Sequence, residues 1–551
     1  MGDTYHPHPE RAYLLYVPFS MPSDGGEKWA ISLPSNSSML LAAALSLAVT
    51  FAFVDLWNLI FFTAISLCNN RKSPRRYAAL VAISTTKWPW AAVTELARFT
   101  WSCGMDTWSC GISSGSSASG KGDLLFGVAF CVLAFCIAST SMVMSIITPS
   151  LMNIGHVAPV QPGAVYWPRA PITKTDEMRE FAIRAPAFLR ALGSVEALGA
   201  VPRAKVFIKP GNRTLEYQYD NIVSSFEYRY HISGIDLGLQ RGADLALEVQ
   251  GFCATEYGWN IEENPTNPGY EFDLYDLWED PDRMAGFSVN NIAAEHITTN
   301  GPKAFFFLNP DSDLQWQTDS NVSYAAIINS AHLPSYTSAG DPWYLTEATD
   351  ESLSAIPYRV RRRRPALSCW EKNQWSYGGH EVASVSDLES IPGISIPHVL
   401  LDILKAAFSG RPMIYNLAAS IGGSAALKSQ AIGSDGIISA QNCKMFEDME
   451  RLILASFIAT RNIFTDAAAT RNLTNRNFEN IARGTDGLPR EGAGNFVLPV
   501  PTIQTFSLTG IIALVGTFII LMLANAVTWV VVGLRQGITT RRTSTAKEKS
   551  V

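Results

Sequence analysis

The side chains with the clearest chemical potential are carboxylates. Between Glu248 and Glu351 the sequence holds eighteen acidic residues and two basic ones, with the densest run, EFDLYDLWEDPD, from Glu271 to Asp282. Most glycoside hydrolases place two carboxylates on either side of the bond they cleave. A glycan-acting hydrolase that uses carboxylates in 248–351 is therefore one hypothesis. The alternative is that these residues form an exposed acidic face.

A second acidic group could bind calcium. Asp311, Asp313 and Asp319 lie close together in NPDSDLQWQTD. This segment lacks the glycine and the closing glutamate of an EF-hand loop. The sequence also has no HExxH, P-loop or C-x-x-C pattern, and its histidines are scattered. We therefore predict no metal, no cofactor and no catalytic residue, and we favour a role without catalysis.

Three cysteines occur in the large central region of the chain, at Cys253, Cys369 and Cys443. Three thiols allow three single pairings and leave one over. We favour a disulfide between Cys253 and Cys369, because both lie in strand-like segments with aromatic neighbours. Cys443, in contrast, begins a long helical pattern.

Three long apolar runs determine on which side of a membrane these residues would lie. Met39–Cys68 contains a single charge, Asp55, whereas 124–152 and 506–534 contain none. About 20 apolar residues in a helix cross the hydrocarbon core of a bilayer, so each run predicts a transmembrane helix. A fourth segment, 77–101, carries three charges and a central proline, and we interpret it as an interfacial helix, with a fourth span as the alternative.

Charges beside these runs predict the sidedness of the chain. Basic residues follow the first run in NNRKSPRR and the last run in RQGITTRRTSTAKEKS. Basic loops stay in the cytoplasm. We therefore expect a short extracytoplasmic N-terminus (1–38), a cytoplasmic loop (69–123), a large extracytoplasmic part (153–505) and a basic cytoplasmic tail (535–551). This places the protein in the plasma membrane or the secretory pathway, as a multi-pass protein.

Glycosylation sequons agree with this orientation. N-x-[ST] occurs in the large part at Asn212, Asn321 and Asn472, and we predict that all three are glycosylated.

The large part changes character along its length. Short β-branched and aromatic segments separated by turn residues predict strands across 153–383. Helical spacing of apolar residues predicts helices across 384–471, and the Asn-, Arg-, Gly- and Pro-rich segment 472–505 is interpreted as a stalk. The predicted fold class is thus a membrane protein with three or four α-helical spans and a large α+β extracytoplasmic domain.

Two short motifs carry a resemblance to a known group. CWEKNQWSY and DMERLILASFIATRNIFTD, placed after two apolar runs and before a third, resemble an uncharacterised family of multi-pass membrane proteins from filamentous ascomycete fungi. The resemblance implies no activity, and it favours a cell-surface or secretory-pathway protein.

The four consecutive arginines Arg361–Arg364 follow the acidic stretch after a short segment, 352–360. On the extracytoplasmic side such a run does not serve nuclear import or nucleic-acid binding. We expect an exposed charged strand against the acidic surface, contributing little stability. Our leading hypothesis is a membrane-anchored glycoprotein whose outer domain binds or senses a cell-wall or other extracellular ligand. Its partners are then the lipid bilayer and that ligand, and no nucleic acid.

Overall fold

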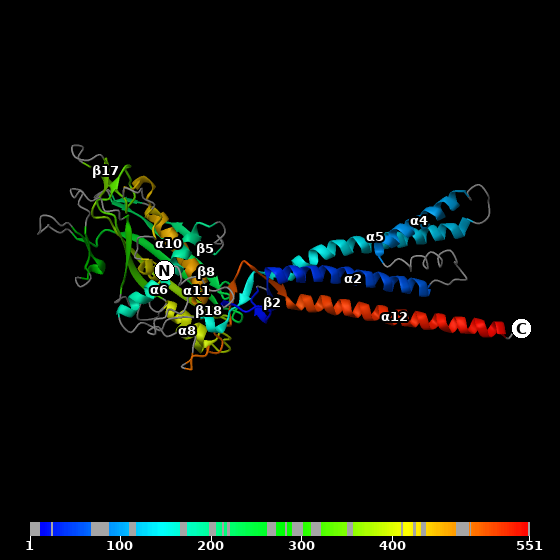
Figure 1. The fold of residues 1–551 in the computed structure, drawn as a ribbon. Helices are drawn as coiled ribbons and strands as arrows, with labels where there is room; N and C mark the ends of the chain where they lie inside the picture. Colours follow the sequence, from blue (N-terminus) through cyan, green and yellow to red (C-terminus); the bar gives the residue numbers. More distant parts are fainter. Residues whose placement is uncertain are drawn as a thin grey trace. The chain divides into compact units, whose positions relative to one another are not determined.

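A computed structural model describes most of the chain, and Figure 1 shows its fold. The described residues are 12–23, 26–67, 88–109, 117–165, 174–197, 205–211, 214–216, 221–261, 272–280, 284–288, 301–309, 321–349, 356–408, 411–421, 426–430, 437–469, 484 and 486–548. They form two compact units. The first comprises Met1–Leu14, Ser20–Glu27 and Pro159–Leu498, and the second Leu15–Phe19, Lys28–Ala158 and Pro499–Val551.

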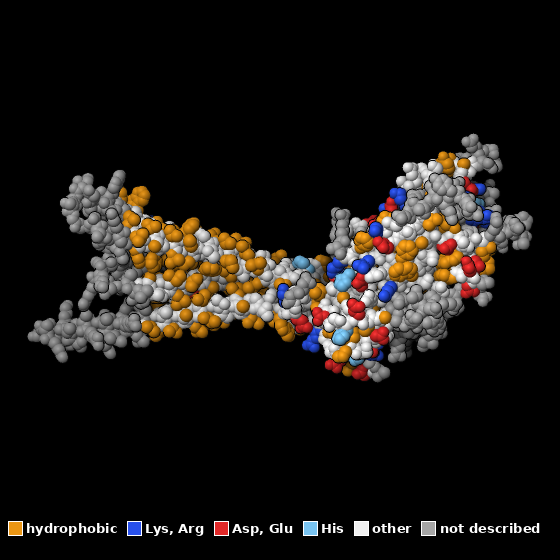
Figure 2. All heavy atoms as spheres, turned by 180° about the vertical axis from the view of Figure 1, so that it is seen from behind, with side chains coloured by type: hydrophobic (Ala, Val, Ile, Leu, Met, Phe, Trp, Pro, Cys, Tyr) orange, Lys and Arg blue, Asp and Glu red, His pale blue; other side chains and the backbone are white. Residues whose placement is uncertain are grey.

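The second unit contains three helices that are long and apolar enough to cross a membrane. They are α2 (Ser35–Leu67), α5 (Ser117–Met152) and α12 (Leu508–Glu548), and their apolar stretches cover Ser35–Ile65, Leu124–Met152 and Leu508–Val531. Leu, Ala, Phe and Val occur all round these helices and not on one face, which is the pattern of a helix in an apolar surrounding. Hydrophobic side chains accordingly cover the helical surface in Figure 2.

A fourth helix, α4 (Pro89–Ser109), packs against α5 in this unit. Trp90 contacts Phe135 edge to face, with ring centroids 5.8 Å apart. Ala92 and Leu96 of α4 are buried in one cluster with Trp57 of α2. Of the predicted interfacial segment 77–101, residues 77–87 lie outside the described residues.

A small antiparallel sheet joins three of the helix ends. Strand β2 (Lys28–Pro34) directly precedes α2, β21 (Ile503–Ser507) directly precedes α12, and β3 (Asn153–Gly155) directly follows α5. The strand β21 pairs with both β2 and β3. The start of α2, the end of α5 and the start of α12 are therefore tied together.

The first unit is built on a seven-stranded antiparallel sheet. Its strand order is β13-β14-β18-β9-β8-β5, with β19 paired to β18. These strands are β13 (Lys303–Leu308), β14 (Asn321–Asn329), β18 (Ala366–Tyr377), β9 (Ala246–Glu256), β8 (Ser225–Ser233), β5 (Val206–Pro210) and β19 (His380–Val382). Strand β8, SFEYRYHIS, alternates strictly between buried and exposed residues, so it presents one apolar and one polar face.

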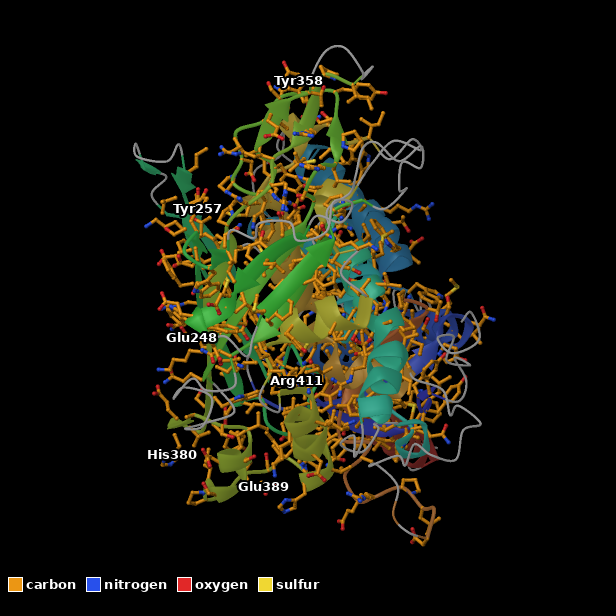
Figure 3. The ribbon with its side chains drawn as sticks, turned by 90° about the vertical axis from the view of Figure 1, so that its left-hand side faces the viewer. Glu248, Tyr257, Tyr358, His380, Glu389 and Arg411 are labelled. Atoms are coloured by element: carbon orange, nitrogen blue, oxygen red, sulfur yellow. A yellow bond between two sulfur atoms is a disulfide. The ribbon has the colours of Figure 1, made fainter. Side chains whose placement is uncertain are left out.

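Helices cover the apolar face of this sheet. They are α6 (Lys174–Val195), α8 (His398–Phe408), α9 (Met413–Ile421), α10 (Met445–Arg461) and α11 (Ile463–Ala469). Tyr230 of β8 meets Phe457 of α10 edge to face, and Trp375 of β18 meets Phe408 of α8 in the same way. Figure 3 shows Tyr358 at one end of this unit and His380 and Glu389 at the other.

The opposite face of the sheet is covered at one end alone. A three-stranded sheet of β10 (Asn260–Ile261), β11 (Phe272–Asp276) and β12 (Met284–Ser288) packs there. Its Tyr275 and Leu277, which follows β11, share an apolar cluster with Ala325, Ile327 and Ala366 of the large sheet. Over β5, β8, β9 and the rest of β18, none of the described elements covers that face.

Shorter elements complete the described chain. They are β1 (Pro18–Met21), β4 (Val157–Pro159), β6 (Thr214–Glu216), β7 (Asn221–Val223), β15 (Pro334–Ser335), β16 (Thr346–Ala348), β17 (Tyr358–Val360) and β20 (Val497–Pro499).

The strand-rich and helix-rich parts follow the predicted order, with two differences. Helix α6 lies within 153–383, where strands were expected; its sequence, KTDEMREFAIRAPAFLRALGSV, packs against α9 and α10. The expected stalk 472–505 contains the buried residues Ala493, Phe496 and Ile503. Phe496 stacks on Phe464 of α11, so the end of this segment is part of the packed structure.

Candidate functional site

An open groove of about 570 Å³ lies on the uncovered face of the seven-stranded sheet. Besides the buried Tyr228, three exposed aromatic side chains line it: Phe207 of β5, Phe252 of β9 and Trp370 of β18. They are 54%, 36% and 42% exposed. Large aromatic side chains are normally buried, and exposed apolar surface beside polar groups is typical of a binding site.

The strand register sets the layout of the groove. Trp370 lies directly opposite Phe252, and Phe252 lies opposite Glu227 of β8. In the next row, two residues along each strand, Gln250 lies opposite Arg229, which lies opposite Phe207. Cross-strand neighbours on one face are about 5 Å apart, so Trp370 and Phe252 are adjacent, and polar side chains separate them from Phe207.

Charged groups around the groove are paired with one another. Arg229 lies 2.9 Å from Glu248, and Lys205 lies 2.5 Å from Asp236. Glu227 lies 3.8 Å from Lys209, on the neighbouring strand. Lys205 and Ser233 hold the pKa of Asp236 below its usual value through hydrogen bonds, although burial acts in the opposite direction. The groove thus offers many hydrogen-bonding groups and little uncompensated charge.

The floor of the groove depends on Gly251. A Cβ atom at this position would lie 2.0 Å from the ring of Tyr228, its partner across β8 and β9. The ring occupies the space that a side chain would fill. Glycine is therefore required here so that Tyr228 can extend across β9 toward β18.

Tyr228 reaches a polar cluster on the helix-covered face of the sheet. Its hydroxyl donates to Glu371 Oε2 at 2.8 Å and lies 3.2 Å from the hydroxyl of Tyr324. Glu371 is 2% exposed and is adjacent to Trp370 in β18. Burial without a cation raises the pKa of Glu371 to about 7, and burial beside this carboxyl raises the pKa of Tyr228 well above its usual value.

Among the described residues, three polar atoms of this cluster lack a hydrogen-bond partner. They are Glu371 Oε1, Asn373 Oδ1 and the hydroxyl of Tyr230. Tyr230 faces Thr460 of α10, whose hydroxyl donates to the carbonyl of Ser456 and keeps its acceptor lone pairs. Unpaired buried polar atoms are costly, so this cluster is the least satisfied part of the core.

The structure brings Cys253 and Cys369 together in the same region. They are opposite each other in β9 and β18, with their sulfur atoms 2.06 Å apart. Cys443 is buried as a free thiol near Ser429, and burial raises its pKa to about 11. A thiol with this pKa is neutral at physiological pH and is a poor nucleophile.

The arginine run differs from its predicted form. Strand β17 ends at Val360, and Arg363 has a left-handed backbone with φ of 56°. Arg364 is 3% exposed and contacts Asp273 at 3.0 Å, and Arg362 contacts the same carboxylate at 3.2 Å. Two arginines thus pair with the acidic stretch as expected, but Arg364 does so inside the core and not on an exposed strand.

Comparison with known families identifies the family of this chain. The model of a domain of unknown function, DUF8406, matches residues 185–498, which is more than half of the sequence. The chain belongs to this family. No curated protein and no solved structure matches it. The DUF8406 match includes the whole seven-stranded sheet, the groove and the polar cluster.

The other predicted sites in the DUF8406 domain are distributed as follows. Asn321 is the first residue of β14, in register with Lys372. Asn212 and Asn472 lie outside the described residues, as do Asp311, Asp313 and Asp319. Across the described ranges, no group of three or more His, Cys, Asp or Glu side chains could hold a metal ion.

A serine pattern occurs outside the DUF8406 domain. G-x-S-x-G is present once, from Gly111 to Gly115. In a hydrolase this pattern follows a strand and precedes a helix. Here it lies between helices α4 and α5, in a segment outside the described residues. Its flanking elements are therefore not those of a nucleophile elbow.

Within the second unit, Asp55 has a specific partner. Asn525 Nδ2 of α12 donates to Asp55 Oδ1 of α2 at 2.9 Å. A carboxyl group is costly at membrane depth and is stabilised by a polar partner on a neighbouring helix. Asp55 thus contributes to contact between helices.

Proposed function

We propose that the protein is a multi-pass, membrane-anchored glycoprotein of the cell surface or the secretory pathway, and that its DUF8406 domain is a non-catalytic binding module. The observation that carries the proposal is the groove with three exposed aromatic side chains on the open face of the sheet. Pockets that combine apolar side chains with a few polar groups are typical binding sites.

The orientation proposed from the charges has support within the second unit. The rule places the start of the first span, the end of the second and the start of the third on the extracytoplasmic side. These are the three ends that β2, β3 and β21 join in one sheet. A sheet of this kind requires all three ends on one side of a membrane.

The spacing of carboxylates favours binding over glycan hydrolysis at this groove. Glu227 lines it, and Glu248, from the acidic stretch, lies beside it. Glu248 is four residues along β9 from Phe252, the partner of Glu227. At about 3.4 Å per residue this separates the backbone positions of the two acids by about 14 Å, whereas glycosidase pairs lie about 5 to 10 Å apart. Both are also paired with basic side chains.

Full-length protein in lipid nanodiscs tests the proposal. Three labelled probes would be titrated: a neutral polysaccharide, heparin and denatured casein, which represents extended peptide. We expect saturable binding of at least one probe, lost in the Trp370→Ala/Phe252→Ala double variant. Trp29→Ala is the control, because Trp29 is another exposed tryptophan on a strand, in β2 of the second unit. If every probe bound the double variant as tightly as it bound wild type, a binding role for the groove would be contradicted.

Sidedness is tested separately in intact cells. An extracytoplasmic DUF8406 domain should be digested by added protease, and its mobility should shift after enzymatic removal of N-glycans. A protected domain without glycans would overturn the orientation.

A further inference from the structure

We infer that the ligand of the groove is a neutral oligosaccharide. This inference rests on the proposed binding function and adds the chemical class of the ligand. Two features of the groove support it: aromatic side chains are exposed to solvent, and the charged side chains Glu227 and Arg229 form ion pairs with neighbouring residues.

The aromatic side chains form a platform of suitable size. Strands lie about 4.8 Å apart, and β18, β9, β8 and β5 are consecutive in the sheet, so Trp370 and Phe207 stand about 15 Å apart. Phe252 lies between them, directly opposite Trp370. A flat platform of this length accommodates more than one sugar ring, and the C–H-rich face of a sugar packs on an aromatic ring much as other apolar groups do.

Hydrogen-bonding groups occupy the gaps in this platform. Gln250 lies between Lys372 and Arg229 in the row next to Trp370 and Phe252. Gln250 Nε2 donates to Glu248, which also holds Arg229. Side chains fixed in this way present oriented donors and acceptors, which hydroxyl groups of a sugar can use without a large loss of side-chain entropy.

The pairing of charges argues for a neutral ligand. An anionic ligand would have to displace Glu248 from Arg229 or Glu227 from Lys209, and a cationic ligand would have to displace the basic partners. These side chains are more than a third exposed, so each exchange is opposed weakly, whereas a neutral ligand requires no exchange at all. A purely apolar ligand, such as a lipid chain, would in turn cover these polar groups without hydrogen bonds.

The experiment uses the full-length protein in nanodiscs and calorimetric titration. The probes are neutral hexasaccharides of glucose, mannose and N-acetylglucosamine, with heparin hexasaccharide and an extended peptide as charged and peptide comparisons. We expect at least one neutral hexasaccharide to bind and its Kd to rise roughly tenfold or more in Trp370→Ala, since aromatic side chains at the centre of an interface carry most of its binding energy.

Three further measurements make the outcome decisive. Phe252→Ala should weaken binding in the same way, Trp29→Ala should leave it unchanged, and near-ultraviolet circular dichroism should show that each variant is folded. If heparin or the peptide bound in a Trp370-dependent way and no neutral sugar did, the inference of a sugar ligand would be overturned. The proposed binding function would still stand. Absence of any groove-dependent binding would overturn both.

Discussion

The ring of Tyr228 lies over Gly251 on the helix-covered face of the sheet, directly behind the groove that both residues border. Gly251 leaves the space, Tyr228 crosses it, and the tyrosine hydroxyl then donates to Glu371. Because Trp370 precedes Glu371 in β18, the lining of the groove and the polar core share one strand.

Replacing Gly251 should destabilise the domain. In Gly251→Ala the added methyl group would overlap the Tyr228 ring, and overpacking of this kind costs about 1–3 kcal/mol. The thermal midpoint of the full-length protein in detergent should fall accordingly. Gly193→Ala is the matched control, because nothing lies within 4 Å of the added atom and alanine favours the helix α6. Equal thermal midpoints for Gly251→Ala and wild type would show that the structure does not require glycine at this position.

Stability of the domain should fall as the pH rises toward and through 7. The pKa of Glu371 is raised in the folded protein to about 7, so the folded state retains a proton that the unfolded state loses nearer pH 4.5. The contribution of the Glu371 proton to the free energy of unfolding is complete below the pKa of the unfolded state. It is lost as the pH rises through the pKa of the folded state, and the total loss is roughly 3 kcal/mol.

Hydrogen exchange of the β9 and β18 amides between pH 5 and 8 measures this effect, after correction for the intrinsic exchange rate. Glu371→Gln, which stays neutral, should abolish the pH dependence. A Glu371→Gln protein with the same pH dependence as wild type would assign the effect to another group.

The arginines should differ in their contributions to stability. Arg364→Ser removes the buried one of the two arginines that contact Asp273, and the donor to the Ile328 carbonyl, and breaking a buried ion pair costs about 3–5 kcal/mol. Arg361→Ser, at an exposed position, should change the unfolding free energy by less than about 0.5 kcal/mol. Chemical denaturation of both variants gives the comparison, and similar losses would show that Asp273 does not depend on Arg364.

Helix contact in the second unit should depend on Asn525. Asn525→Leu removes the partner of Asp55 and should weaken the α2–α12 contact by about 1 kcal/mol. Disulfide crosslinking between cysteines introduced at facing positions of α2 and α12 measures this contact in nanodiscs. Thr517→Leu, on the same helix with its hydroxyl bonded within α12, is the control, and an equal loss in both variants would argue against a specific Asp55 partner.

The sequence predicted the elements better than the site. Apolar runs of about 30 residues with at most one charge specify α2, α5 and α12 by themselves, and the alternation in SFEYRYHIS specifies which face of β8 is buried. Helix α6 was missed because its apolar residues are interrupted by charges and a proline, and its packing against α9 and α10 decides its structure. The burial of Arg364 was missed because Asp273 lies 91 residues earlier in the sequence.

The groove could not be predicted because its aromatic residues come from three distant segments. One local indication was nonetheless present in β9, ALEVQGFCATE. Its exposed positions read Glu248, Gln250 and then Phe252, so an aromatic residue occurs where the alternation predicts a polar one. The adjacent Gly251, in the middle of a strand, is a second indication of a close approach.

The sheet that joins the helix ends has a consequence for biosynthesis. Its middle strand, β21, is the last of the three to be translated, because it begins at Ile503, whereas β2 begins at Lys28 and β3 at Asn153. Until the ribosome has passed residue 507, β2 and β3 lack the strand that separates and pairs them. The sheet of the second unit can therefore be completed only after the DUF8406 domain has been fully synthesised. A chain interrupted within that domain would contain α2 and α5 without the strand that joins their ends.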